Sequence, residues 1–434
     1  MEERLVHDVA CTVCGCVCDD LVAHVSGARL TSLDNACPLA EPWFAGLNDC
    51  QPPEARVNGH PVDLHAAEER ACEILLASRA PLIFGLSRSS TAGQRAAVRL
   101  ADRIGANIDT TASVCHGPSI MAIQQVGEST CSLGEARNRA DLVLFWGADP
   151  LTTHPRHLER YSVDAQGMIV PDGRANRTVV VVDSQPTMTG QRADCFFAVA
   201  RQRQFELLWS LRQVIRGQDL PANADPGLPA LQVRELARLL TGCRYGVVFF
   251  GLGLAQSEHG HALVEALLRL VAELNQYTRF AARRLRVPGD VAGADCVLCW
   301  ETGFPFAVNL ARGYPRYNPL DYSANSLLAR REVDTCLFVG SESVVHFSPA
   351  AQAHLSDIPT IVLDYPHITP RFTPTVHFVT SVYGVHQPGT AYRMDEVPIP
   401  LRAFLPSTYA SDQELLTRFL ARYDILASRN TRTE

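Results

Sequence analysis

The sequence predicts an α/β protein made of parallel-sheet domains, with a small cysteine-rich cap at the N-terminus. Apolar runs without polar interruption alternate with amphipathic helical patterns, which is typical of parallel strands covered by helices on both faces. The chain of 434 residues is also too long for one ordinary core. Near its start, the stretch "CTVCGCVCDD" places four cysteines within eight positions. Together these observations predict a cap followed by two α/β domains.

The composition excludes several classes of protein. A hydrophobic content of 47% with 20% charged residues describes a well-packed chain. The net charge of −7, without any run rich in Lys or Arg, argues against a nucleic-acid partner. No apolar run reaches the roughly 18 residues of a membrane span, and the acidic start lacks the apolar core of a secretory signal. We therefore expect a cytoplasmic protein, in which most of the 14 cysteines are buried thiols.

The cysteines of the cap, residues 1–55, have the spacing of metal ligands. Cys11, Cys14 and Cys18 form C-x2-C-x3-C, and Cys37 follows far along the chain. A two-residue turn brings both sulfurs of a pair to one side, and three cysteines close together with a distant fourth are common in iron–sulfur proteins. We expect a [4Fe–4S] cluster on these four residues. Structural zinc and free thiols are the alternatives, and Cys16 breaks the simplest zinc arrangement.

The first α/β domain is predicted over residues 56–225. Its elements are, in order, a helix over 65–78, a strand in 80–87, a helix over 91–106, strands in 140–150 and 177–187, and a helix over 203–217. The apolar runs "LVLFW" and "VVVV" mark strands buried on both faces.

The second α/β domain is predicted over residues 226–434. It contains a strand in 244–256, a helix over 261–278, a strand in 334–343, a helix over 348–358, a strand in 358–367 and a final helix over 411–426. Ser411 is a suitable N-cap for that last helix.

Loops that follow parallel strands are the usual ligand sites, because the carboxyl ends of strands and the N-termini of helices meet there. Five loops qualify, among them "WGADP", "VDSQPT" and "GLGLAQ". The last one lacks the third glycine of a dinucleotide fingerprint, so a nicotinamide enzyme is disfavoured. For any single loop, an ordinary turn is the simpler interpretation.

The middle of the chain contains two further candidate sites. Cys115 and His116 lie in a turn that is expected to open a helix at Pro118 or Ser119, where a thiolate gains from the helix dipole. Such a thiolate is a metal ligand or a nucleophile, and a buried neutral cysteine is the alternative. The stretch "THPRH" places His154 and His157 around a proline. It suits the binding of an anion or the transfer of protons, and a solvated loop is equally consistent with it.

Several motifs in order along the chain resemble the B subunit of formylmethanofuran dehydrogenase, which belongs to the molybdopterin oxidoreductases. They are "CTVCGCVCDDL", "NAC", "TASVCHGPS", "LGEARNRADLVLFWG", "HPRH", "CWETGFPF", "YPRYNP" and "GTAYRM". The resemblance implies a formate dehydrogenase-like fold without a C-terminal β-barrel, which a separate subunit supplies. It also implies a [4Fe–4S] cluster on Cys11, Cys14, Cys18 and Cys37.

For a catalytic member, the resemblance further implies a molybdenum or tungsten bis-pterin centre. Cys115 matches the metal ligand, His116 lies beside it, and Arg286 matches an active-site arginine. The strand-end loops that match pterin contacts contain Asp149, Asp183, Thr187, Gly251 and Gly253.

Those loops depart from the family pattern. Asp149 replaces an asparagine, "GSES" places Glu342 where the family has Asp-Pro, and Asp290 lies in a stretch that has lost a histidine. Added negative charge should weaken the binding of an anionic pterin dinucleotide. The departures therefore argue against a working bis-pterin centre.

A related bacterial complex accounts for such losses. The formyltransferase/hydrolase complex of tetrahydromethanopterin-linked one-carbon metabolism releases formate without a redox step, so its B subunit can be structural. We therefore expect a structural B subunit, with amidohydrolase-type, formyltransferase and small structural subunits and a furan-type one-carbon carrier as partners. The alternative is the catalytic subunit of formylmethanofuran dehydrogenase, which interconverts CO2 and formate. The intact Cys115 and cluster cysteines favour that alternative.

Overall fold

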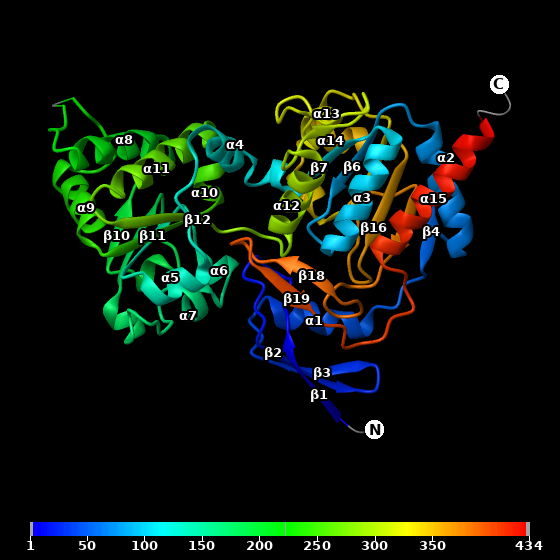
Figure 1. The fold of residues 1–434 in the computed structure, drawn as a ribbon, viewed down its shortest axis with the longest axis horizontal. Coiled ribbons are helices and arrows are strands. Elements are labelled where there is room, and N and C mark those ends of the chain that lie inside the picture. The colour runs from blue at the N-terminus through cyan, green and yellow to red at the C-terminus, as the bar shows by residue number, and fades with distance from the viewer. Residues whose placement is uncertain (1–2, 222, 431–434) are drawn as a thin grey trace. The chain divides into compact units, whose positions relative to one another are not determined.

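The computed structural model of the chain describes residues 3–221 and 223–430, and it separates into two compact units (Figure 1). Unit 1 comprises Met1–Val114 and Pro288–Glu434, and unit 2 comprises Cys115–Val287. The predicted domain boundaries of 56–225 and 226–434 are therefore wrong. Strands from both ends of the chain complete one sheet in unit 1, and the sequence of unit 2 is inserted between them.

Unit 2 is built on a five-stranded parallel sheet with the order β10-β9-β8-β11-β12. The strands are β8 (Leu142–Trp146), β9 (Thr178–Asp183), β10 (Cys195–Ala198), β11 (Tyr245–Phe250) and β12 (Arg279–Arg284). From β8 the chain proceeds to β9 and β10 on one side, and later to β11 and β12 on the other. The loops after β8 and β11 therefore diverge and leave a crevice at this reversal of strand order.

Helices cover the sheet of unit 2. They are α4 (Gly117–Val126), α5 (Leu133–Arg139), α6 (Pro150–Thr153), α7 (His157–Tyr161), α8 (Gln204–Ile215), α9 (Ala230–Gly242), α10 (Leu252–Ala255) and α11 (Gly260–Leu274). Short 3-10 turns occupy Gly173–Asn176, Gly190–Arg192 and Arg201–Arg203. One core cluster joins alternate strand residues such as Leu144 and Val248 to Leu208 of α8 and Leu267 of α11. Helix α4 begins with Pro118 in its first turn, as the sequence predicts.

Unit 1 contains, within the described residues, a nine-stranded sheet with the order β14-β13-β7-β6-β15-β16-β17-β4-β5. The strands are β4 (Ala55–Val57), β5 (His60–Val62), β6 (Pro81–Gly85), β7 (Asn107–Thr110), β13 (Val308–Asn309), β14 (Arg316–Tyr317), β15 (Thr335–Val339), β16 (Thr360–Asp364) and β17 (Val376–Val379). The five central strands are parallel, and the outer ones are antiparallel. Strand order reverses between β6 and β15, so this unit has a second crevice position.

The helices of unit 1 lie on both faces of its sheet. They are α2 (Leu64–Ala77), α3 (Thr91–Ile104), α12 (Val291–Thr302), α13 (Ala324–Ala329), α14 (Pro349–Leu355) and α15 (Asp412–Asn430), with 3-10 turns at Thr111–Val114 and Glu342–His346. Ile83 of β6 packs in the core with α2, α3 and α15. Leu82 and Phe84 pack on the opposite face with α13 and α14. Strand β6 is thus apolar on both faces, which explains its uninterrupted hydrophobic run.

The remaining elements of unit 1 surround the N-terminal cysteines. Strands β1 (Glu3–Val9), β2 (Leu21–Ser26) and β3 (Arg29–Asp34) form an antiparallel sheet, and α1 (Ala40–Asp49) follows. A second hairpin consists of β18 (Gly389–Tyr392) and β19 (Pro398–Leu401).

The α/β class and the parallel sheets are confirmed. Each of the twelve helices and strands predicted from the sequence has a counterpart within a few residues of its expected range. Ser411 caps α15 as expected, since its Oγ accepts from the Glu414 N–H at 3.1 Å and Glu414 accepts from the Ser411 N–H at 2.8 Å.

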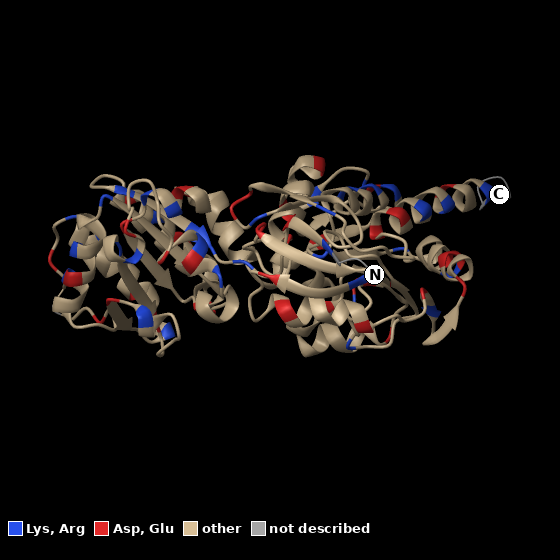
Figure 2. Ribbon diagram, turned by 90° about the horizontal axis from the view of Figure 1, so that it is seen from below, with Lys and Arg blue, Asp and Glu red and all other residues tan. Residues whose placement is uncertain are grey.

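Two surface properties complete the description. Within residues 3–221 and 223–430, no helix combines the length and apolar character that a membrane span needs. Basic and acidic residues are interspersed along the ribbons of both units (Figure 2).

Candidate functional site

The cysteine loop, residues 11–18, connects β1 to β2 in unit 1 and is buried. A hydrogen bond from Cys11 N–H to Cys18 O, at 2.8 Å, closes its base, and Val17 N–H donates to Cys14 O at 3.1 Å. Val17 has a φ of 37°, a conformation that costs energy for a β-branched residue. The loop thus holds a strained, specific shape rather than that of a simple hairpin turn.

The predicted ligands Cys11, Cys14, Cys18 and Cys37 are all less than 10% exposed. Burial raises the pKa of the Cys11 thiol well above its usual value, and the nearby Cys14, Cys18 and Cys37 add to this. The fold therefore brings the four thiols into one neighbourhood. A hydrogen bond with Cys16 lowers the pKa of Cys14, which gives Cys16 a supporting position beside the set.

The donor set suits an iron–sulfur cluster. Four buried thiols without a carboxylate among them are soft ligands. Among the described residues, no three His, Cys, Asp or Glu side chains converge as ligands of one metal ion. A [4Fe–4S] cluster is compatible with this spacing, because each of its irons takes a single cysteine.

Two contacts fix the cysteine loop to the rest of unit 1. Arg88 donates through Nη1 to Thr12 O at 2.9 Å, and the Met394 N–H donates to Gly15 O at 2.8 Å. Gly289 passes so close that a Cβ there would lie 2.0 Å from Thr12 O. Side-chain and backbone contacts from three distant segments thus set the position of the loop.

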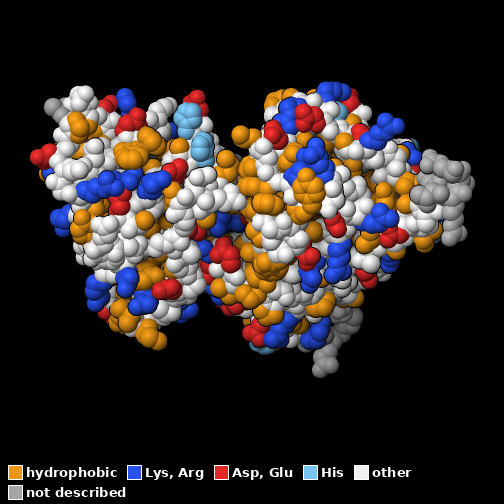
Figure 3. All heavy atoms as spheres, turned by 45° about the horizontal axis from the view of Figure 1, so that its top comes forward, with side chains coloured by type: hydrophobic (Ala, Val, Ile, Leu, Met, Phe, Trp, Pro, Cys, Tyr) orange, Lys and Arg blue, Asp and Glu red, His pale blue; other side chains and the backbone are white. Residues whose placement is uncertain are grey.

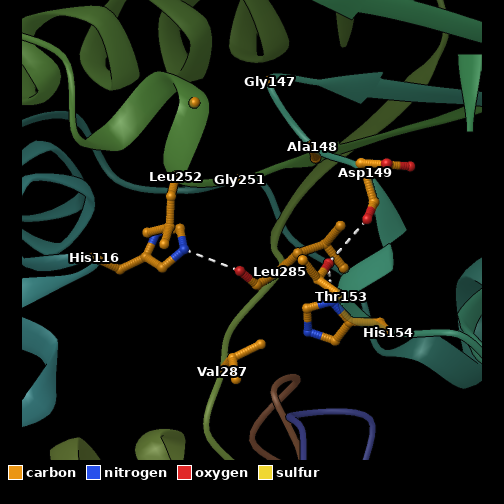
Figure 4. Close-up of a pocket in the computed structure, with 11 residues that line it drawn as sticks. His116, Gly147, Ala148, Asp149, Thr153, His154, Gly251, Leu252, Leu285 and Val287 are labelled. Atoms are coloured by element: carbon orange, nitrogen blue, oxygen red, sulfur yellow. Dashed lines mark hydrogen bonds between the residues drawn. The ribbon is translucent and has the colours of Figure 1, made fainter. Parts of the chain in front are cut away.

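Unit 2 has an open crevice at its reversal of strand order (Figure 4). A cavity of about 230 Å³ is lined by His116, Asp149, Thr153, His154, Leu285 and Val287 and by the loops around Gly147 and Gly251–Gly253. A neighbouring cavity of about 450 Å³ shares Gly147, Asp149 and Gly253, and adds Asp183, Thr187 and Arg201. All five predicted pterin-contact residues, Asp149, Asp183, Thr187, Gly251 and Gly253, therefore lie on these two cavities.

Glycines allow the two crevice loops to approach each other. A Cβ on Gly253 would lie 2.8 Å from Gly147 O, and one on Gly251 would lie 2.7 Å from the same oxygen. Gly147 itself has a φ of 56°. These positions require glycine for backbone packing, whether or not a ligand is bound.

Asp149 is held by hydroxyl and amide donors. Its Oδ1 accepts from Thr189 N at 2.9 Å and Thr189 Oγ1 at 2.5 Å, and its Oδ2 accepts from Thr152 Oγ1 at 2.7 Å. Although burial opposes ionisation, these hydrogen bonds lower the pKa of Asp149, so it remains anionic. Asp149 is thus a structural anion of the loop after β8 that also lines the crevice.

His116 and His154 hold the chain that follows β12. His116 Nε2 lies 3.0 Å from Leu285 O, and His154 Nε2 lies 2.9 Å from Arg286 O. A carbonyl only accepts, so each Nε2 carries the proton. The Nδ1 atoms then accept from Ser119 Oγ at 3.0 Å and Thr153 Oγ1 at 2.8 Å. Both rings are therefore neutral supports of the crevice wall.

The pKa values agree with that geometry. Burial, and then the charges of Arg286 and Arg284, lower the pKa of His116 well below its usual value. Burial lowers the pKa of His154 to about 4, and that of His157 to about 3. The alternative of a solvated "THPRH" loop is wrong for the two histidines, which are at most 1% exposed.

Cys115 and Arg286 belong to unit 2 and are next in sequence to His116, Leu285 and Val287, which line the first cavity. Cys115 is 8% exposed and precedes α4, and Arg286 is 1% exposed. Among the described residues that line the two cavities, neither of them occurs. Sequence reasoning missed Thr189 and Leu285, whose roles depend on hydrogen bonds to distant residues.

The corresponding crevice of unit 1 is filled. Between the loops after β6 and β15 lies a space of only about 10 Å³, lined by Arg88, Gly340, Glu342, Asp364, Tyr365 and Asp412 among others. Arg88 Nε donates to Glu342 Oε2 at 2.6 Å across it. Burial raises the pKa of Asp364 to about 6, although Ser341 donates to both of its oxygens. This space is far smaller than the two cavities of unit 2.

Asp290 corrects one step of the sequence argument. It is fully buried and accepts from the Gly293 N–H at 3.1 Å, Tyr392 N–H at 2.6 Å and Gln94 Nε2 at 2.9 Å. Burial raises its pKa well above the usual value. Asp290 is the N-cap of α12 rather than an exposed anion beside a ligand, so its predicted repulsion of a pterin is wrong.

No protein-family model matches the sequence. The chain is 38% identical over 424 residues to the B subunit of the tungsten-containing formylmethanofuran dehydrogenase 2 of Methanocaldococcus jannaschii, over 95% of this chain and 97% of that protein. It is 28% identical over 287 residues to the B subunit of the formyltransferase/hydrolase complex Fhc of Methylorubrum extorquens, over 66% of this chain and 74% of that protein.

Solved structures share the fold. The X-ray structure of the formyltransferase/hydrolase complex (FhcABCD) from Methylorubrum extorquens in complex with methylofuran contains a chain with a TM-score of 0.72 and 24% identity, over 86% of this chain and 99% of that one. Acetylene hydratase from Pelobacter acetylenicus gives a TM-score of 0.69 with 11% identity, over 96% of this chain and 69% of that one. At 38% identity over almost the full length of a curated relative, the chain belongs to the family of formylmethanofuran dehydrogenase B subunits.

Proposed function

We propose that the chain is the B subunit of a formyltransferase/hydrolase complex in tetrahydromethanopterin-linked one-carbon metabolism, in which the formyl group is released as formate. In this proposal the subunit is structural, and its molybdopterin-type site is degenerate. The observation that carries the proposal is the filled crevice of unit 1, where the Arg88–Glu342 ion pair leaves about 10 Å³.

A bis-pterin centre needs two crevices that can each admit a dinucleotide. Unit 2 offers cavities of about 230 and 450 Å³, but unit 1 offers neither the room nor the charge. Glu342, Asp364 and Asp412 line the unit 1 crevice opposite a single arginine. Placing an anionic pyrophosphate among them would add repulsion in a poorly solvated site. Loss of the redox centre fits a complex whose reaction is transfer and hydrolysis.

The cysteine set is proposed to keep a [4Fe–4S] cluster. Cys11, Cys14, Cys18 and Cys37 would each bind one iron, and such a cluster supplies one-electron transfer when bound. In a structural subunit it would instead hold the cysteine loop together, in addition to the hydrogen bonds that the loop receives from Arg88 and Met394. The four thiols, all buried, support this assignment.

Partner subunits are the third part of the proposal. Large apolar side chains are exposed on the described surface, including Met168 at 83%, Leu231 at 78% and Leu320 at 71%. Figure 3 shows such hydrophobic side chains among charged ones on one face. The relative from Methylorubrum extorquens is a subunit of the Fhc complex, and this supports a chain that functions inside an assembly. The partners would be amidohydrolase-type, formyltransferase and small subunits acting on a furan-type carrier in the cytoplasm.

A second candidate is the catalytic subunit of a formylmethanofuran dehydrogenase. Two observations favour it: Cys115 is retained at the start of α4, and the crevice of unit 2 is open. The 38% identity to the tungsten-containing relative points the same way.

An assay on the purified complex separates the two candidates. The proposal predicts formate release from a formylated furan carrier with no electron acceptor present, and no reduction of a viologen dye when formate is added. Dye reduction driven by formate, at a rate comparable with formate release, would instead establish the dehydrogenase.

A further inference from the structure

One buried cation links the cysteine loop to the strand ends of unit 1. Arg88 follows β6 and its side chain is 12% exposed. Nη1 donates to Thr12 O at 2.9 Å, and Nε donates to Glu342 Oε2 at 2.6 Å. Tyr365 Oη donates to Arg88 O at 2.5 Å and fixes its backbone. The guanidinium is thus held between the loop and a single carboxylate.

Its charge is maintained in this position. Burial opposes ionisation of Arg88, but Glu342 together with Tyr383 and Tyr365 offsets that effect, and the pKa of Arg88 is raised. The guanidinium donates to Thr12 O, and Thr12 lies between the predicted ligands Cys11 and Cys14 in the sequence. The charge on Arg88 therefore lies against the loop segment that carries two predicted cluster ligands. The other tie to the loop, from the Met394 N–H to Gly15 O, is a neutral backbone contact.

Neighbouring charges matter more for a buried cluster than for an exposed one. Reduction of a [4Fe–4S] cluster adds one electron to a group that already carries negative thiolate charge. In a low dielectric, a nearby cation stabilises the reduced form and a nearby anion destabilises it. Arg88 contacts the loop through Thr12 O, and Glu342 contacts Arg88, so the two charges have opposite expected effects on the cluster.

We propose that Arg88 is a positioning residue of the cysteine site, which fixes the loop through Thr12 and sets the reduction potential of the cluster held there. Glu342 opposes it by partly neutralising the guanidinium. The inference rests on the cluster proposed above, and it does not depend on whether a pterin is bound.

The test is a redox titration of the intact complex, purified anaerobically, with dithionite as the electron donor and the electron paramagnetic resonance signal of the reduced cluster as readout. We expect Arg88→Gln to reduce the ratio of reduced to oxidised cluster about tenfold at the wild-type midpoint, a shift of about 59 mV to more negative potential for one electron. Glu342→Gln should shift the midpoint in the positive direction. Arg88→Lys keeps the charge and should stay close to wild type.

A matched control comes from another ion pair of unit 1. Arg95 donates to Glu301 of α12 at 2.7 Å, and its side chain is 49% exposed, in contrast to the buried Arg88. Its charge is therefore screened by solvent. Arg95→Gln should leave the midpoint unchanged.

The outcomes separate the inference from its premise. One outcome is four irons per chain with the same midpoint potential in wild type, Arg88→Gln and Glu342→Gln. It would overturn the role of Arg88 but would support the cluster assignment. A wild-type chain without iron would overturn the cluster assignment and this inference together. If Arg88→Gln fails to fold, the midpoints of Glu342→Gln and Arg88→Lys still test the inference. A purely structural role of Arg88 predicts no positive shift of the midpoint in Glu342→Gln.

Discussion

At the scale of single residues, the two histidines of the crevice show how burial changes a role. The resemblance places His116 beside Cys115, the expected metal ligand of a catalytic member. In the fold, both nitrogens of His116 are used, and so are those of His154. A neutral imidazole that donates to a backbone carbonyl is a support, and protonation would break the acceptor side of each network.

The pH dependence of stability tests this role. His154 has a folded-state pKa of about 4 against an unfolded value near 6.5. Below pH 6.5 the unfolded chain binds the proton and the folded chain does not, so stability is lost as the pH falls towards 4. His154 should contribute about 1.4 kcal/mol per pH unit to the slope of the unfolding free energy against pH, and His154→Gln should remove that contribution. Urea unfolding at pH 7.5, 6 and 5 measures it.

Exposed His65 supplies the control for that experiment. Its side chain is 71% exposed, so His65→Gln should retain the wild-type slope. Identical slopes for His154→Gln and wild type would contradict the supporting role.

The crevice glycines yield a second prediction. A Cβ on Gly253 would meet Gly147 O at 2.8 Å, whereas one on Gly242, the last residue of α9, meets nothing within 4 Å. Gly253→Ala should therefore lower the free energy of unfolding by about 1–3 kcal/mol, as the loops must move apart. Gly242→Ala should be neutral or stabilising by up to about 1 kcal/mol. Thermal unfolding of both variants decides, and equal melting temperatures would count against the close approach.

Sequence predicts the ligand residue types but not all of their surroundings. The four cysteines are recognisable from spacing, since a turn fixes where their sulfurs lie. The prediction for Asp290 is wrong because its partners Gln94 and Tyr392 lie about a hundred or more positions away. His116 and Leu285 are likewise far apart in the sequence, at 169 positions.

At the scale of elements, strands buried on both faces are the most predictable. β8 and β9 are continuous apolar runs, which leave little alternative to a central parallel strand. β12 is not predicted, because its sequence RFAARR contains three arginines and lacks the apolar run of a buried strand. Arg283 and Arg284 are nevertheless less than 10% exposed, because the surrounding tertiary structure covers them.

The cap of α15 carries a prediction at this scale. Ser411 and Glu414 exchange hydrogen bonds at the start of the helix, whose Leu415 and Phe419 pack in the core of unit 1. Ser411→Ala should cost about 1 kcal/mol of stability. Ser428→Ala, near the opposite end of the same helix, should cost less than half as much. Denaturant midpoints compare the two, and an equal loss would refute the capping assignment.

At the scale of the whole molecule, the sequence predicts two α/β units but places their boundary wrongly. Linear order suggests domains of consecutive residues. The sheet of unit 1 instead takes β6 and β7 from before residue 115 and β15, β16 and β17 from after residue 287. Nothing local marks such an insertion, because every strand looks the same whichever sheet it joins.

The two units differ in the feature that matters for function. The strand order reverses in both units. The crevice at this reversal is open in unit 2, whereas the Arg88–Glu342 ion pair occupies the crevice of unit 1. The family's bis-pterin centre would need both crevices. The metal and pterin content of the chain therefore tests the account as a whole.

The most direct measurement is the content of iron, molybdenum, tungsten and pterin in the intact complex, purified anaerobically. Our account predicts about four irons for each copy of this chain, no molybdenum or tungsten, and no extractable pterin, in a complex that still releases formate. One molybdenum or tungsten with two pterins for each copy would contradict it.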